Sequence, residues 1–147
     1  MKREILNQCV LKFSSLSQNE GFARSAAAAF MAQYDPTVTE IGEIKTAVSE
    51  AVTNAVVHGY RGTVGVIELT LRYLSGGVLY ICVKDKGAGI ADIGQAMTPL
   101  FTTATEEERS GLGFSVMESF TDLLKVKSSP GKGTAVVMER KLKRRVS

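Results

Sequence analysis

The spacing of hydrophobic side chains changes once in the middle of the chain, and this change limits the possible folds more than any other feature. Up to Gly59 the spacing is helical, with apolar side chains at Ile41, Ile44, Val48, Ala51, Val52 and Ala55. Past Gly59 apolar and polar residues alternate over residues 64–73 and 78–85, which Ser75-Gly76-Gly77 separates. The sequence therefore predicts a helix from about Thr39 to His58, followed by a β-hairpin.

The flanking segments predict further strands and helices. Residues 4–13 read as a first strand, and Ser17-Gln18-Asn19-Glu20 has the form of a capping box that opens a helix ending near Asp35-Pro36. That helix is expected to bury Phe22, Ala26, Ala29, Phe30 and Tyr34. A long loop is predicted over residues 86–111 and a third helix over residues 112–120. A last hairpin follows, with strands at residues 123–128 and 134–142.

These elements predict a single domain over residues 1–147 with the α/β two-layer sandwich architecture. About three helices would cover one face of a mixed sheet of four to five strands. The shares of 44% apolar and 22% charged residues are those of a globular chain with one core. No apolar run is long enough to cross a membrane, and the N-terminus makes a poor signal peptide. We expect a cytoplasmic protein with no membrane partner.

Cysteines and charge leave two further questions. A disulfide between Cys9 and Cys82 is possible on count alone, but the cytoplasmic expectation favours two thiols in apolar surroundings. The net charge of +3 comes partly from residues 140–145, RKLKRR. This run suits nucleic acid or an acidic partner, yet a solvated tail is the better interpretation, because no motif places a helix for a DNA groove. We therefore expect no direct nucleic-acid binding.

Glu50, Asn54 and His58 recur every four residues along the predicted second helix, so they can share one side of it. An exposed Glu, a tolerated Asn and a His near the helix end would explain them without any function. However, Asn is a mediocre helix former, and its side-chain carbonyl is an oxygen ligand of the kind that Mg²⁺ takes. A carboxylate one turn away can accept a proton from a hydroxyl or from water.

Three glycine-containing segments follow this helix. Asp85-Lys86-Gly87-Ala88-Gly89 ends a predicted strand, where a carboxylate can accept from an amine and glycines admit a flat ligand. Arg109-Ser110-Gly111-Leu112-Gly113 leads into a predicted helix, whose first amides suit phosphates. Gly131-Lys132-Gly133-Thr134 opens the last strand. Each segment alone is also compatible with an ordinary turn.

The order of these motifs along nearly the whole chain resembles the gyrase, chaperone, histidine kinase and MutL superfamily of ATPases, which has the Bergerat (GHKL) fold. Within it, SQNEGFAR, SEAVTNAVVHGY and PLFTTATEEERSGLGF resemble the small serine kinases that act as anti-sigma factors. The resemblance implies binding of ATP and Mg²⁺. It also implies two protein partners, a sigma factor and an anti-anti-sigma factor that is phosphorylated on serine, and it implies a homodimer.

The resemblance also implies roles for particular residues. Asp85 would bind the adenine amine with Thr134 assisting, while Gly87 and Gly89 let the loop pack along base and sugar. Asn54 would hold Mg²⁺, and Glu50 would be the catalytic base. Further implied residues are a charge-balancing Arg109, a lid with Thr102 and Thr103, phosphate-binding Ser110, Gly111, Leu112 and Gly113, and Arg24 on the partner surface. His58 matches the family motif without a role that its chemistry explains, so a structural histidine is favoured.

Two functions from different classes compete on this evidence. The first is an ATP-dependent protein serine kinase that also sequesters a sigma factor and phosphorylates its antagonist. The second is a binding module in which ATP tunes sigma-factor affinity and no phosphate moves. Glu50, Asn54 and Arg109 together favour the kinase. A histidine-kinase ATPase domain is disfavoured, because the single His58 lies within the helix that would bind Mg²⁺.

Overall fold

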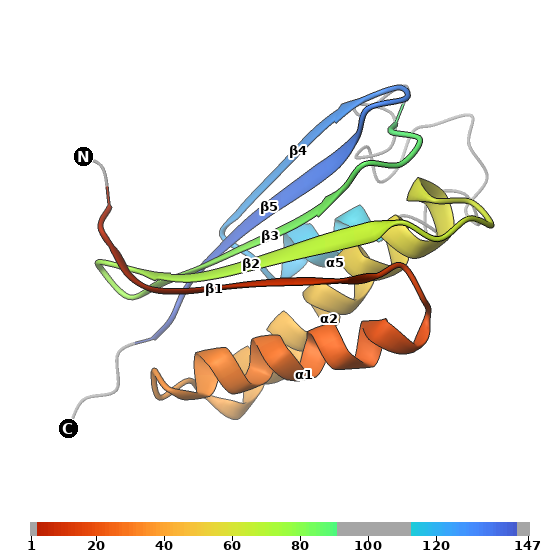
Figure 1. Ribbon diagram of the computed structural model, residues 1–147. Coiled ribbons are helices and arrows are strands. Elements are labelled where there is room, and N and C mark those ends of the chain that lie inside the picture. Colours follow the sequence, from red (N-terminus) through yellow and green to blue (C-terminus); the bar gives the residue numbers. More distant parts are fainter. Residues whose placement is uncertain (1–2, 91–112, 144–147) are drawn as a thin grey trace.

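The computed structural model describes residues 3–90 and 113–143. A five-stranded sheet runs in the order β1-β2-β3-β5-β4, and the helices lie against one face of it (Figure 1). The strands are β1 (Ile5–Ser14), β2 (Val66–Leu74), β3 (Val78–Asp85), β4 (Leu123–Ser129) and β5 (Gly133–Lys141). The helices are α1 (Gln18–Ala32), α2 (Val38–Asn54), the π-helical turn η1 (Ala55–Gly59) and α5 (Phe114–Ser119). This is the two-layer sandwich that the sequence predicts.

The sheet is antiparallel at every pairing, so the expectation of a mixed sheet was wrong. One connection and the strand order explain this result. The α1–α2 pair returns the chain to the end of β1 at which it left, and β2 therefore runs back alongside β1, with Ser14 opposite Val66. Strands β3 and β4 run in the same direction, but β5 lies between them and pairs with both.

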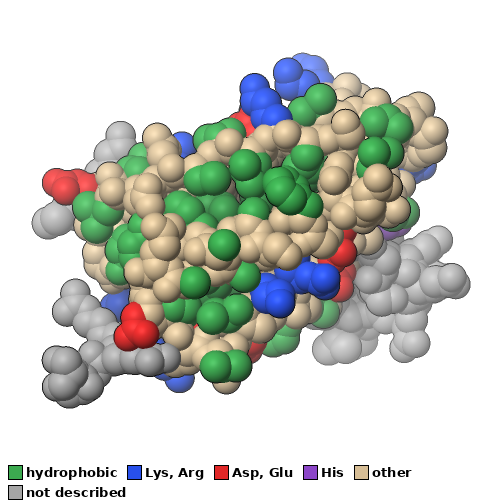
Figure 2. Space-filling view, turned by 60° about the horizontal axis from the view of Figure 1, so that its bottom comes forward, with side chains coloured by type: hydrophobic (Ala, Val, Ile, Leu, Met, Phe, Trp, Pro, Cys, Tyr) green, Lys and Arg blue, Asp and Glu red, His purple; other side chains and the backbone are tan. Residues whose placement is uncertain are grey.

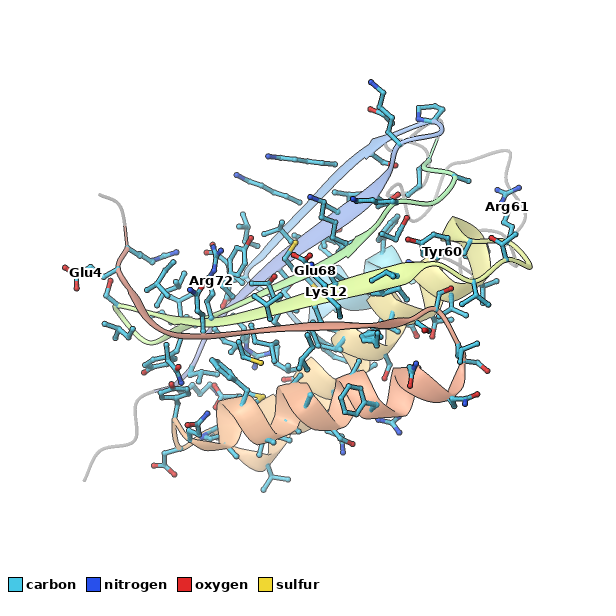
Figure 3. All side chains as sticks on the ribbon, in the orientation of Figure 1. Glu4, Lys12, Tyr60, Arg61, Glu68 and Arg72 are labelled. Atoms are coloured by element: carbon cyan, nitrogen blue, oxygen red, sulfur yellow. The ribbon has the colours of Figure 1, made fainter. Side chains whose placement is uncertain are left out.

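The core lies between the sheet and the helices. Leu69, Leu71, Leu79 and Ile81 from the sheet meet Ile44, Val48, Val52 and Met117 from the helices, and all of these side chains are fully buried. On the opposite face of the sheet, Lys12, Glu68 and Lys84 stand side by side in register on three strands. Figure 3 shows Lys12, Glu68 and Arg72 from this sheet.

Helix α1 is rotated relative to the prediction. Its buried residues are Ala23, Ala27, Phe30 and Met31, whereas Phe22 is 52% exposed and packs edge-on against Phe13 at 6.2 Å between ring centroids. The alanine run made the phase ambiguous, because alanines suit either side of a helix. The molecular surface seen from this side exposes several hydrophobic side chains, with Lys, Arg, Asp and Glu side chains around them (Figure 2).

The predicted capping box at Ser17 was wrong, because the Ser17 side chain makes no capping hydrogen bond. A capping box forms instead at the start of α2. Thr37 Oγ1 accepts from the Glu40 N–H at 3.1 Å, and Glu40 Oε1 accepts from the Thr37 N–H at 2.8 Å. Helix α2 therefore begins one residue before the predicted Thr39.

The basic segment near the C-terminus is not a solvated tail over residues 140–143, so that interpretation was wrong. Arg140 donates to the Phe120 carbonyl at 2.7 Å and to Glu43 Oε1 at 3.0 Å. Leu142 is 5% exposed, and the Lys143 N–H donates to Glu40 Oε2 at 2.8 Å. Strand β5 and its extension are thereby fastened to the beginning of α2.

Cys9 and Cys82 are both free thiols. Cys9 stands opposite Leu71 on the core face of the sheet, whereas Cys82 stands opposite Thr70 on the other face. Side chains on opposite faces of one sheet cannot form a disulfide with each other. In the part of the chain that the structure describes, no helix combines the length and apolarity needed to span a membrane.

Candidate functional site

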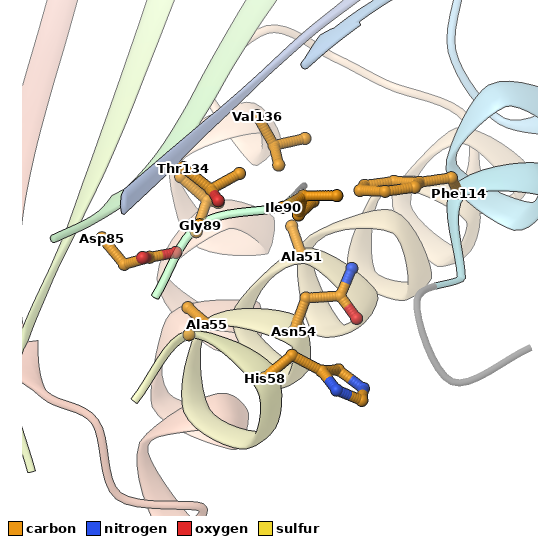
Figure 4. A pocket seen from close by; sticks show the side chains of 12 residues that line it. Ala51, Asn54, Ala55, His58, Asp85, Gly89, Ile90, Phe114, Thr134 and Val136 are labelled. Atoms are coloured by element: carbon orange, nitrogen blue, oxygen red, sulfur yellow. The ribbon is translucent and has the colours of Figure 1, made fainter. Parts of the chain in front are cut away.

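A pocket lies where the C-terminal part of α2 and η1 meet the ends of β3 and β5. Asn54, His58, Asp85, Gly89 and Thr134 line it (Figure 4). Apolar walls come from Ala51, Ala55, Val83, Ile90, Phe114 and Val136. Residues that the sequence analysis drew from three separate motifs thus surround one cavity.

Asp85 lies at the sheet side of the pocket and is only 6% exposed. It is the last residue of β3 and stands opposite Thr134 of β5, so strand register brings these two side chains together. Burial raises the pKa of the Asp85 carboxyl, and hydrogen bonds from the backbone N–H groups of Gly87 and Thr134 lower it by a smaller amount. The Gly87 bond measures 2.8 Å. A buried carboxylate with a raised pKa that lines a cavity is a candidate for a binding or catalytic group.

The glycines after Asp85 allow backbone to approach backbone. A Cβ at Gly87 would overlap the carbonyl of Gly59, which also accepts from the Ala88 N–H at 2.7 Å. At Gly89 a Cβ would overlap the carbonyl of Ser129, and its φ of 77° also favours glycine. The contacts of these glycines therefore hold the loop between η1 and the β4–β5 hairpin, and Gly89 lines the pocket as well.

Asn54 lies at the helix side of the pocket, at the junction of two kinds of helical turn. Helix α2 ends at Asn54, and the next turn is π-helical, with the Tyr60 N–H donating to the Ala55 carbonyl at 3.1 Å. The predicted extent of this helix was right, but its last turn is not α-helical. Isolated π-turns occur frequently at functional sites. The turn ends at Gly59, where a Cβ would lie only 3.1 Å from the Asp85 carboxylate.

Glu50 lies one turn before Asn54, beside the start of α5. A side chain at Gly113 would overlap the Glu50 carboxylate. Gly113 is the N-cap residue of α5 and has a left-handed φ of 62°. Glu50 is partly buried there. Its carboxylate and the N-terminal end of α5 are therefore neighbours, although 63 residues separate them in the sequence (113 − 50).

Several predicted site residues lie outside the described part of the chain. They are Thr102, Thr103, Arg109, Ser110, Gly111 and Leu112. Arg24 is described and lies on α1, where it is close to Glu20 at 3.6 Å and where 43% of its side chain is exposed. It does not line the pocket.

Two residues near the pocket were missed from the sequence. The Ser128 hydroxyl contacts Ile90, Gly133 and Thr134. The Tyr60 hydroxyl donates to the Val66 carbonyl at 2.7 Å and accepts from the Lys86 N–H at 2.9 Å, which places its ring at the start of β2 (Figure 3). Tyr60 ends the segment SEAVTNAVVHGY but received no role there, and Ser128 belongs to no glycine motif. The hydrophobic pattern gives no sign of the contacts of either residue.

The antiparallel sheet, the helical layer on one face and this pocket define a class of ATPase domain. The sequence profile of the histidine kinase-like ATPase domain matches residues 13–140. The solved RsbU and RsbW domains of a Mycobacterium tuberculosis protein superpose with a TM-score of 0.68 at 17% identity, covering 95% of this chain and 33% of that one. A histidine kinase domain from Erythrobacter litoralis superposes with a TM-score of 0.57 at 22% identity, and the match covers 86% of this chain and 60% of that one. At these identities the structures are evidence for the fold alone.

Curated relatives narrow the class. An anti-sigma F factor of Thermoanaerobacter sp. is 56% identical over 137 residues, covering 93% of this chain and 95% of the relative. Anti-sigma F factors of Geobacillus sp. and Clostridium novyi are 52% and 49% identical, and the matches cover 92% and 96% of their lengths. The chain belongs to the anti-sigma F factor family, within the histidine kinase-like ATPases.

Proposed function

We propose that this protein binds and inhibits a sporulation sigma factor and is an ATP-dependent protein serine kinase, which phosphorylates a serine of the sigma factor's antagonist. One observation supports the ATP site above all: Asp85 and Thr134 from the sheet and Asn54 from α2 line the same pocket. The sigma-factor role comes from the name of relatives that match along nearly their whole length. If Asp85 and Asn54 lay on opposite sides of the molecule, one ATP could not contact both residues, and the proposed ATP site would be excluded.

The sheet side of the pocket suits adenine. The Asp85 carboxylate is buried and keeps a raised pKa despite two backbone hydrogen bonds. Its oxygen atoms can accept a further hydrogen bond, and an exocyclic amine provides the donor. Guanine carries a carbonyl oxygen at that position, and two acceptors facing each other repel. A site built around one buried hydrogen bond can discriminate by as much as about 10⁴-fold.

The helix side suits Mg²⁺. The donor chemistry fits this ion, because Asn54 lines the pocket and offers an amide oxygen. Mg²⁺ is commonly held by one or two protein oxygens together with phosphates and water. When bound, it would offset negative charge on the phosphates. Asn54 would hold it, 9% exposed and anchored at the end of α2.

Glu50 is the proposed catalytic base. Its carboxylate lies beside Gly113 at the start of α5, the end from which helix amides face phosphates. It would accept the proton of the substrate serine hydroxyl as the γ-phosphoryl group is transferred. Arg109 is proposed to balance charge on that group, with Ser110, Gly111, Leu112 and Gly113 contacting phosphates and Thr102 and Thr103 in a lid.

The protein partners are proposed on the same basis as the kinase activity. Arg24 would contact a partner protein, and the 43% exposure of its side chain leaves it accessible for this role. The sigma factor and its antagonist are the proposed partners, and a homodimer is the proposed state. These assignments rest on the resemblance and the relatives' names.

The test is phosphoryl transfer from labelled ATP to a purified anti-anti-sigma protein in the presence of Mg²⁺. We expect label on a serine of that protein. Glu50→Gln should reduce the transfer rate by about 10²–10⁴-fold, because it removes the base, while leaving ATP affinity almost unchanged. Tight ATP binding by the wild type without any label transfer would replace the kinase with the sigma-binding module. Equal loss of affinity and transfer in Glu50→Gln would remove Glu50 from the base role.

A further inference from the structure

Ser128 of β4 is the point where three parts of the pocket's sheet side are joined. Its Oγ accepts from the Ile90 N–H at 2.7 Å and donates to the Gly133 carbonyl at 3.0 Å. The same Oγ lies 2.8 Å from Thr134 Oγ1, a contact in which either hydroxyl could be the donor. Ile90 and Thr134 both line the pocket.

Counting protons decides the direction of that contact. A serine hydroxyl has one proton and two lone pairs. The Ile90 N–H uses one lone pair of Ser128, and the Gly133 carbonyl takes its proton. Thr134 must then donate its own proton to the second lone pair. In the reverse arrangement, the Ser128 oxygen and the Gly133 carbonyl would be two acceptors 3.0 Å apart with no proton between them.

The consequence is that the Thr134 hydroxyl faces the pocket as an acceptor. Its proton is directed to Ser128, so only its lone pairs are available to a ligand. Thr134 stands opposite Asp85 in the strand register, and both line the cavity (Figure 4). The sheet side of the pocket therefore presents two acceptors next to each other. An amine with two protons matches this pair, whereas a carbonyl oxygen is repelled by both.

We propose that Ser128 is a positioning residue that sets purine specificity, because it fixes the direction of the Thr134 hydroxyl. The inference rests on the proposed ATP site and concerns the source of its selectivity. Ser128 need not touch the nucleotide. It acts by keeping Thr134 from turning its proton toward a carbonyl at position 6 of the purine.

The measurement is equilibrium binding of ADP and of inosine diphosphate, whose purines carry an amine and a carbonyl at position 6. Inosine also carries a proton on N1, and this difference is the same for wild type and variant, so a change in the affinity ratio still reports on the variant. Neither carries a γ-phosphate, so no transfer interferes. In Ser128→Ala the Thr134 proton is free to point at the carbonyl. We expect the ratio of ADP affinity to inosine diphosphate affinity to fall by about 3- to 10-fold, the worth of one neutral hydrogen bond. The sugar and phosphates cancel in this ratio.

Three further variants separate positioning from packing. Ser129→Ala is the matched control, because Ser129 is the exposed neighbour of Ser128 on the same strand, and its ratio should match the wild type. Ser128→Thr keeps a hydroxyl and should restore selectivity. In Thr134→Val the ratio should already be lowered, and adding Ser128→Ala should change it no further, because Ser128 acts through the Thr134 hydroxyl.

Two results would overturn the inference. One is an unchanged ratio in Ser128→Ala when both affinities fall together, which would limit Ser128 to anchoring Ile90. The other is a fall in the affinity ratio, on adding Ser128→Ala to Thr134→Val, that equals the fall caused by Ser128→Ala alone. The effect of Ser128 would then be independent of Thr134. No binding of ADP by the wild type would instead refute the proposed ATP site, and this inference with it.

Discussion

Asp85 and Glu40 are buried carboxylates in two regions of the molecule, and the surroundings shift their pKa values in opposite directions. Asp85 is 6% exposed at the end of β3, beside the pocket, and Glu40 is 1% exposed in the first turn of α2. At Asp85, burial raises the pKa of the carboxyl by more than its hydrogen bonds lower it. At Glu40, burial also acts to raise the pKa, but hydrogen bonds from Thr37 and Lys143 outweigh it and the pKa is lowered.

The difference distinguishes a carboxylate that joins two parts of the fold from the one that we propose binds adenine. Glu40 joins the cap of α2 to the end of β5, and each of its oxygens accepts a backbone hydrogen bond of 2.8 Å. These hydrogen bonds favour its charged form. The fold buries Asp85 without compensating its charge to the same degree, so a ligand that brings a donor gains what the protein alone lacks. Perturbed groups of this second kind are the ones expected in binding sites.

The largest effect is expected from Asp85→Asn. Losing the acceptor for the adenine amine should weaken ADP binding by about 10²–10³-fold, because a charged hydrogen-bond partner is lost and an amide N–H₂ can face the amine instead. Calorimetric titration with ADP measures this. A loss below about tenfold would show that Asp85 does not read the base.

The stability of Asp85→Asn should move in the other direction. A raised pKa means that the folded state favours the protonated carboxyl, so its contribution to stability is present at acid pH and is lost as the pH rises through the folded pKa. Near neutral pH the variant should therefore unfold at a higher denaturant concentration than the wild type. The gap should close as the medium is made acidic. A less stable variant at neutral pH would contradict the comparison.

The comparison also shows which parts of the molecule are predictable from sequence. The strands follow from local alternation, and their predicted limits differ from the observed ones by no more than two residues. Asp85, Thr134 and Asn54 were named from motif order, and the pocket brings them together. Strand register does part of this work, since pairing β3 with β5 necessarily sets Asp85 opposite Thr134.

Contacts between distant segments were the ones that the sequence did not reveal. Glu40 and Lys143 are 103 residues apart, and neither residue has a neighbour that signals the contact. The phase of α1 was missed because alanines carry little phase information, and Phe22 was assigned to the core for that reason. The close backbone contacts of Gly87 and Gly89 depend on Gly59 and Ser129, which only the folded chain brings near.

A second, smaller effect is expected from Gly87→Ala, which tests how the Asp85 region is built. The new methyl group would overlap the Gly59 carbonyl, so backbone must shift on one side of the pocket. We expect a loss of about 1–3 kcal/mol in the free energy of unfolding, and weaker ADP binding because the Gly87 N–H also donates to Asp85. Gly42→Ala in α2 is the control, because its methyl group would meet nothing within 4 Å. That variant should gain about 0.5–1 kcal/mol.

The region around Glu40, where the start of α2 meets the segment after β5, is tested by Glu40→Gln. One of its two buried backbone hydrogen bonds would be replaced by a contact between two N–H groups, and we expect a loss of about 1–3 kcal/mol in stability at neutral pH. A lowered pKa means that this stability is present above the ordinary glutamate range and is lost as the pH falls through the folded value. The difference between wild type and variant should thus shrink below about pH 4. ADP affinity should not change, and a large change would link this region to the pocket.

The smallest effect concerns the two capping positions of α1 and α2. Thr37→Ala removes the hydroxyl that accepts from the Glu40 N–H at 3.1 Å, and a cap of this kind contributes about 1 kcal/mol. Ser17→Ala should change the free energy of unfolding by only a few tenths of a kcal/mol, because the Ser17 side chain makes no capping bond. Urea denaturation of both variants under one set of conditions measures the contrast. Equal losses would mean that Ser17 caps α1 after all, and would contradict the contrast between the two helix starts.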